Sequence, residues 1–145
     1  MKRLIPLTLF GLLLTACQTP KVNAGNDNQT LVQKLVHHNF VLTKVNGKTI
    51  RYKQTLPSIS FGENMFTSAT MCNEFNGIAS ITDSKLLVTS ISKTELECVD
   101  EDLSKLDILI NKMLTKGATV TYSHNQLVLT QGPYSLVYIL RDYIN

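Results

Sequence analysis

Charged side chains are scarce in this chain: only 17% of its 145 residues are Asp, Glu, Lys or Arg. The surface must therefore be covered largely by uncharged polar residues. The formal charge of +3 shrinks further if a leader is removed, because loss of Lys2 and Arg3 leaves 12 basic against 11 acidic side chains. That near-balance gives no electrostatic reason to expect binding to nucleic acid.

Catalytic signatures are lacking as well. The seven glycines are scattered and form neither a dinucleotide-binding nor a phosphate-loop pattern, and G-x-S-x-G and H-E-x-x-H do not occur. His37 and His38 are adjacent, so their side chains point apart on a helix or a strand, and we expect no metal site there. We therefore expect no catalytic, cofactor-binding or metal-binding residues, and a protein that is not an enzyme.

The longest apolar run, residues 4–14, is too short to span a bilayer as a helix, which needs about 20 residues. It follows two basic residues and has the length of a secretory h-region. It ends in Leu-Thr-Ala-Cys at residues 14–17, which resembles a bacterial lipobox. We expect residues 1–16 to be a lipoprotein signal peptide and Cys17 to become a lipidated N-terminus. An ordinary signal peptide with a chance cysteine is the alternative.

The stretch after Cys17 is polar and cannot bury enough apolar area to fold. We expect residues 17–33 to be the lipidated N-terminus and a flexible tether, with a short helical turn from Thr30 capped by Asn28 or Thr30. By resemblance to the bacterial sorting rule, the absence of Asp at position 18 points to an outer-membrane lipoprotein that faces the periplasm. Residues 34–145 would then form the folded domain.

That domain consists mainly of short runs rich in β-branched residues, separated by turn formers. Asn46-Gly47 between two such runs is the strongest hairpin signal. Residues 99–116 differ, because their apolar residues have helical spacing and Gly117 follows as a C-cap. The final run, residues 134–141, is apolar on both faces and is expected to be covered on both. The fold class is mainly β (α+β), a small antiparallel β-barrel or strongly curled sheet of seven or eight strands with one packed helix.

Two cysteines remain in the folded part, Cys72 and Cys98, 26 positions apart. In an oxidising compartment they are expected to form a disulfide, which would contribute about 3.5 kcal/mol on the chain-entropy estimate. Two buried free thiols are the alternative. A catalytic thiol would need a neighbouring base, and nothing in the sequence places a histidine beside either cysteine.

Two motifs carry a family resemblance. One is Cys72-Asn73-x-Phe75-x-Gly77, and the other is Thr94-x-x-x-Cys98 ahead of the helix. With them the chain, from about residue 35 to its end, is similar to the META domain. The resemblance implies a small, mainly antiparallel barrel with a helix and no established enzymatic activity. It also implies a setting among bacterial envelope stress proteins linked to heat induction and novobiocin tolerance.

The motif itself is best explained structurally. Asn73 and Asn76 beside Gly77 fit a turn or bulge, since an Asn amide can satisfy neighbouring backbone groups, and Phe75 would pack inward. A ligand site is the alternative.

We expect a monomeric, non-enzymatic stress lipoprotein, held at the membrane through Cys17, that acts through contacts with an unknown envelope protein. The alternative function is a lipocalin-like small-molecule carrier. An interior filled by side chains favours protein contacts, and an open apolar cavity of about 300 Å³ or more favours a ligand.

Overall fold

The computed structural model describes residues 11, 24–52 and 56–142, so Cys17 and nearly all of the expected signal peptide lie outside the described residues. The helices are α1 (Ala24–Leu35) and α2 (Glu101–Lys116), with a short 3-10 turn at Glu63–Met65. The strands are β1 (His38–Val45), β2 (Lys48–Thr49), β3 (Ser58–Phe61), β4 (Phe66–Thr70), β5 (Glu74–Thr82), β6 (Lys85–Lys93), β7 (Ala118–Ser123), β8 (Gln126–Gln131) and β9 (Tyr134–Leu140).

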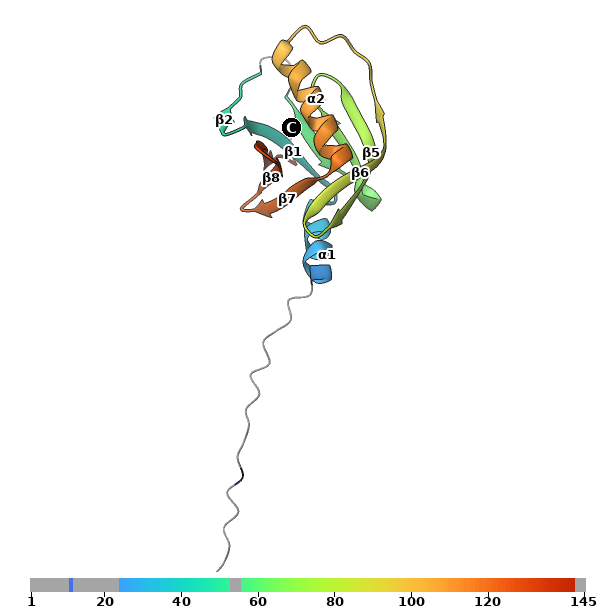
Figure 1. Ribbon diagram of the computed structural model, residues 1–145, viewed down its shortest axis with the longest axis vertical. Coiled ribbons are helices and arrows are strands. Elements are labelled where there is room, and N and C mark those ends of the chain that lie inside the picture. Colours follow the sequence, from blue (N-terminus) through green and yellow to red (C-terminus); the bar gives the residue numbers. More distant parts are fainter. Residues whose placement is uncertain (1–10, 12–23, 53–55, 143–145) are drawn as a thin grey trace, which may run out of the picture.

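All strand pairings of the described residues are antiparallel, in the order β2-β1-β3-β4-β5-β6-β7-β8-β9. β1 also pairs with β9, so eight strands close into a barrel and β2 is an additional short strand (Figure 1). Closure leaves each of the eight with a partner on both sides and so removes the sheet edges. The expected small antiparallel barrel with a packed helix is confirmed.

Three strand connections are two-residue turns with positive φ at both positions. They are Asn46-Gly47 (50° and 80°), Asp83-Ser84 (51° and 59°) and His124-Asn125 (51° and 60°). Such turns match the right-handed twist of the strands that they join. The hairpin predicted at Asn46-Gly47 is confirmed, although its second strand, β2, has only two residues.

Helix α2 fills the place where the barrel is least complete. β6 and β7 pair only at Lys85↔Thr119 and Leu86↔Ala118, and α2 packs on β6 and on β8 (Figure 1). The Asp100 carboxylate caps the helix by accepting from two backbone N–H groups. The helix buries one apolar stripe into the barrel: Leu106, Ile110, Met113 and Leu114. The predicted helix is confirmed and begins at Glu101.

The interior of the barrel is filled by side chains. Its largest fully buried members include Phe40, Phe61, Phe75 and Tyr138, and Phe40 contacts Phe61 edge-to-face with ring centres 6.1 Å apart. This is the arrangement that favours protein contacts over a ligand held inside. One expectation was wrong: the second face of β9 is not covered, because it forms the outer wall of the closed barrel, and Ile139 is 46% exposed.

Part of the segment expected to be a flexible tether is helical. Helix α1 already begins at Ala24, within the predicted spacer, and Asn28 lies inside the helix instead of capping it. The reason is tertiary: Leu35 is fully buried in the core and Leu31 packs against it, while the Asn28 side-chain oxygen accepts from the backbone N–H of Ser84 at 3.1 Å. Neither helix of the described chain has the length and apolar character of a bilayer-spanning segment.

Candidate functional site

The two cysteines of the folded part are bonded to each other. Cys72 lies just before β5, and Cys98 lies in the connection between β6 and α2, with their Cα atoms 5.9 Å apart. The predicted disulfide is confirmed. It fixes the start of a central strand to the segment that leads into the helix, and so closes a loop that contains β5 and β6.

A buried carboxylate, that of Asp107 on α2, lies beside this disulfide. Its Oδ1 accepts from the backbone N–H groups of Cys72 and Asn73, both at 3.0 Å. Its Oδ2 accepts from Asn73 Nδ2 at 2.7 Å and lies 3.4 Å from Cys98 Sγ. Hydrogen bonds to an ionised acceptor are about twice as strong as neutral ones. Asp107 therefore anchors the helix to the strand start on which the family motif begins.

The side chain of Asn73 completes this cluster. Its Oδ1 accepts from the Thr94 hydroxyl at 2.9 Å and from the Leu96 N–H at 2.6 Å, and its Nδ2 also donates to the Leu96 carbonyl at 3.2 Å. The prediction that the Asn73 amide satisfies backbone groups is confirmed, but those groups lie more than 20 positions away. Asn73 thus joins the two sequence motifs, since Thr94 begins the second of them.

Three potential metal ligands meet at this point: Cys72, Cys98 and Asp107 have ligand atoms within 4.8 Å of one another. Zinc requires cysteine as thiolate. In the disulfide these sulfurs are bonded to each other and cannot serve in that way. The cluster is therefore a structural junction, and the sequence analysis missed its acid, Asp107.

The end of the family motif lies in a strand and not in a turn. Asn76 pairs with Ser92 and Ile78 with Thr89, so the register shifts at Gly77 and the extra residue of the bulge lies in β6, where Ser90 has a positive φ of 53°. A Cβ at Gly77 would stand 2.5 Å from Val88 Cγ1 and 2.8 Å from the carbonyl oxygen of Thr89. Glycine is needed there because β6 approaches so closely. The expected bulge is found beside Gly77, but its extra residue belongs to the partner strand β6 and not to the motif, and Phe75 packs inward as predicted.

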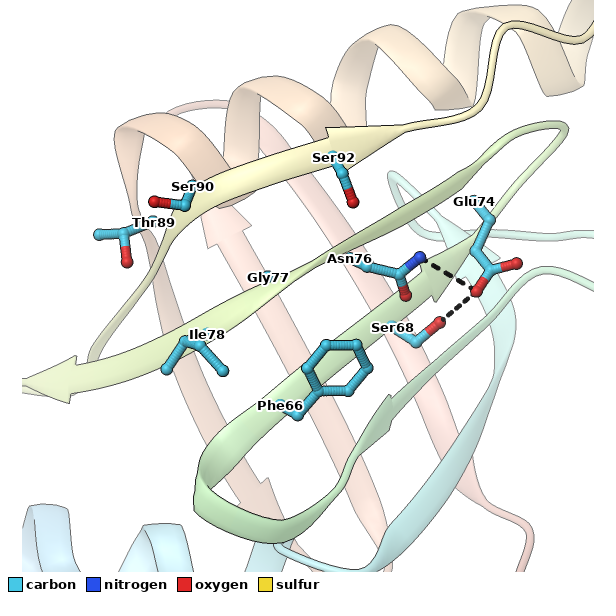
Figure 2. A pocket seen from close by; sticks show the side chains of 9 residues that line it. All are labelled: Phe66, Ser68, Glu74, Asn76, Gly77, Ile78, Thr89, Ser90 and Ser92. Carbon is cyan, nitrogen blue, oxygen red and sulfur yellow. Dashed lines mark hydrogen bonds between the residues drawn. The ribbon is translucent and has the colours of Figure 1, made fainter.

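The bulge shapes a groove on the outer surface of β4, β5 and β6, shown in Figure 2. This β4–β6 groove has a volume of about 560 Å³ and is lined by Phe66, Ser68, Glu74, Asn76, Gly77, Ile78, Thr89, Ser90 and Ser92. Phe66 and Ile78 are direct cross-strand partners, and each is 49% exposed. This aromatic and aliphatic pair leaves apolar area exposed on an otherwise polar face.

The other end of the β4–β6 groove is polar. Glu74 Oε1 accepts from the Ser68 hydroxyl at 3.1 Å and from Asn76 Nδ2 at 3.2 Å (Figure 2). Because both donors bind the same oxygen, the carboxylate is held in one orientation. The groove therefore offers an apolar contact and a fixed hydrogen-bond acceptor to a molecule that docks on it. Sequence reasoning missed Phe66 and Ser68, although their alternation along one strand places them on the same face.

The two adjacent histidines lie in different local structures. His37 lies in a positive-φ connection after α1, whereas His38 Nδ1 is 2.6 Å from Asp142 Oδ2. Partial burial would raise the pKa of Asp142, but hydrogen bonds from the Asn39 N–H and from His38, together with the charge of His38, lower it below its ordinary value. This pair ties the start of β1 to the segment that follows β9.

Comparison with known proteins agrees with the fold. The META domain family matches residues 33–142. The chain is 35% identical to heat shock protein HslJ of Escherichia coli (strain K12) over 146 aligned residues that cover both chains completely. A protein structure solved by NMR, with 38% identity, superposes with a TM-score of 0.72 over 79% of this chain and 97% of its own. A second NMR structure, of a Burkholderia xenovorans protein with 14% identity, covers 96% and 100% of the two chains at a TM-score of 0.62 and supports the fold alone.

Proposed function

Because this chain belongs to the META domain family, we propose that it is a non-enzymatic heat-shock-type lipoprotein of the bacterial cell envelope. A stress-related role follows from its full-length similarity to heat shock protein HslJ. In this proposal Cys17 carries the lipid, the folded domain faces the periplasm from the outer membrane, and the domain acts as a monomer on another envelope protein. The family resemblance extends the proposal to outer-membrane maintenance and novobiocin tolerance.

The observation that carries the contact role is the Phe66–Ile78 pair in the β4–β6 groove. Two large apolar side chains that are each half exposed and paired across two strands leave apolar area that a partner would remove from water. Glu74, at the other end of the groove, supplies a fixed polar contact that would set orientation. The filled interior supports the same choice, because the core residues leave the outer surface as the place of recognition.

Site-specific photocrosslinking in living cells tests the contact. A photoreactive phenylalanine analogue replaces Phe66, and the matched control places it at Val99, which is fully exposed ahead of α2. After heat stress we expect Phe66 to give a discrete crosslinked envelope protein and Val99 to give none. Identical patterns at both positions would refute the assigned surface.

A second experiment tests anchoring and physiology. Cells lacking the gene are complemented with the wild type, with Cys17→Ala or with Ile78→Glu, and novobiocin survival and labelling by radioactive palmitate are measured. We expect only the wild type to protect the cells fully. Cys17→Ala should lose the palmitate label and its attachment to the membrane. Ile78→Glu should keep the label and the attachment but no longer bind the partner protein. Label retained in Cys17→Ala, or full protection by Ile78→Glu, would contradict the proposal.

A further inference from the structure

A second groove lies between α2 and the β1–β2 hairpin, which face each other in Figure 1. This α2–β2 groove has a volume of about 760 Å³, within the range of about 300–1,000 Å³ typical of small-molecule sites. Its apolar lining includes Val45, Ile50, Leu106 and Leu109. Ile108, on the same wall, is 70% exposed, so the groove offers apolar surface to a ligand and not only to the core.

The charge of the α2–β2 groove is strongly biased. Its lining includes one carboxylate, Asp102, and four cations, Lys48, Arg51, Lys105 and Lys112. None of the four cations is in an ion pair within the described part of the chain. The whole chain carries a formal charge of only +3, so this bias is local. Apolar walls with unpaired cations are complementary to a molecule that is apolar and carries negative charge.

One end of the groove is less favourable for an anion. Tyr52 lies there, and burial together with the charges of Asp102 and Asp100 raises the pKa of its phenol. The same two carboxylates that disfavour a phenolate would disfavour the anionic group of a ligand. An apolar tail carries no such penalty, so this end suits the tail.

The opposite end of the groove holds Lys48 and Lys112 and lies away from Asp102, the one carboxylate of the lining. Lys112 Nζ stands 5.7 Å from the centre of the Tyr134 ring. The tip of the β1–β2 hairpin is held beside that residue, because the Asn46 N–H donates to the Ser135 carbonyl at 2.8 Å and the Ser135 N–H donates to Asn46 Oδ1 at 2.9 Å. Lys48 follows that tip directly. Both lysines therefore belong to the same end of the groove.

We propose that the α2–β2 groove binds a single-chain fatty acid as its carboxylate, with the acyl chain along α2 and the carboxylate between Lys48 and Lys112. From Asp102 to Lys112 the helix extends about 15 Å at 1.5 Å per residue, which suits one acyl chain of medium length. Each lysine supplies a point charge with three N–H donors, which a carboxylate placed between the two can accept. This site is distinct from the β4–β6 groove and does not depend on the function proposed above.

Fluorescence titration with cis-parinaric acid, an intrinsically fluorescent fatty acid, tests the site. The full-length chain is used as Cys17→Ser, so that no lipid at that residue competes. We expect saturable binding with a Kd in the micromolar range, displacement by dodecanoate, and at least tenfold weaker displacement by methyl dodecanoate, which lacks the charge. The pair Lys48→Gln/Lys112→Gln should weaken binding about tenfold. The control pair Lys34→Gln/Lys116→Gln makes the same charge change outside the groove and should leave binding unchanged.

Ile108→Asp supplies an independent variant, because its exposed side chain can be changed without disturbing the core, and it should also abolish binding. Absence of saturable binding up to about 100 μM, or equal binding by both lysine pairs, would overturn the proposal. It would equally be overturned if a polyglutamate peptide, but not dodecanoate, displaced the probe. Retention on phosphatidylglycerol vesicles without binding of the soluble fatty acid would overturn it in favour of a membrane surface contact.

Discussion

Asp107→Asn is the sharpest test of how the motif cluster holds the barrel together. The substitution keeps the shape of the side chain but replaces one acceptor oxygen by a donor. If the remaining oxygen keeps the bonds to the backbone N–H groups of Cys72 and Asn73, the new NH2 group faces Asn73 Nδ2, now 2.7 Å from Oδ2. Asn73 cannot turn its amide over without losing the bonds that its Oδ1 accepts from Thr94 and Leu96.

The magnitude follows from these contacts. Hydrogen bonds to charged groups contribute about 1.5–3 kcal/mol each, and leaving a buried donor unsatisfied costs about 1–3 kcal/mol. Loss of one hydrogen bond to a charged group, with partial relaxation of the others, should lower the free energy of unfolding by about 2–4 kcal/mol. Urea unfolding followed by circular dichroism measures it as a lower midpoint at unchanged slope. Glu101→Gln is the control, since it removes an exposed carboxylate from the same helix.

Two outcomes would refute this reasoning. The first is that Asp107→Asn lowers the free energy of unfolding by only the few tenths of a kcal/mol expected for removing an exposed first-turn carboxylate such as Glu101. The second concerns a double-mutant cycle of Asp107→Ala with Asn73→Ala. We expect a coupling free energy of about 1 kcal/mol or more, because the two side chains are directly hydrogen-bonded. Independent effects would mean that the cluster is not a cooperative unit.

Three further variants test other parts of the fold. Gly77→Ala should destabilise by about 1–3 kcal/mol through overpacking, whereas Gly62→Ala should be nearly neutral in the same urea assay, because the nearest atom to an added Cβ there, the Phe66 carbonyl oxygen, is 3.6 Å away. Tyr138→Phe should be neutral or stabilising by about 1 kcal/mol, because the buried hydroxyl has no partner among the described residues; a clear loss in melting temperature would contradict this. Asp142→Asn should cost about 0.2–1 kcal/mol above pH 4, and its difference from the wild type should vanish as pH falls through the lowered pKa of Asp142; a difference that persists in acid would refute the pairing with His38.

Local chemistry explains what the sequence made predictable. Helix α2 could be recognised because its apolar spacing, its acidic first turn and Gly117 all lie within one continuous segment. The Asn46-Gly47 hairpin was predictable for the same reason, since its turn conformation depends on its own two residues. Once such a turn is placed, it also sets the register of the two strands that it joins.

Elements fixed by distant partners escaped prediction. The first turns of α1 are held by a bond from Ser84, 56 positions away, to Asn28, and the closure of β1 on β9 depends on residues almost 100 positions apart. Asp107 left one usable signal: it is a charged residue in the apolar stripe between Leu106 and Ile110. A charge on the buried face of a helix requires partners elsewhere in the fold.

The arrangement of the two motifs also bears on where function resides. Asn73, Thr94, Cys98 and Asp107 direct their polar atoms toward one another or toward the backbone, so a change at any of them should damage stability before it affects recognition. The β4–β6 groove has the opposite character, because half of the Phe66 side chain stays exposed. The family motifs therefore serve to anchor α2 and the segment before it to the start of β5, and the choice of partner must be decided on surfaces that this anchoring does not require.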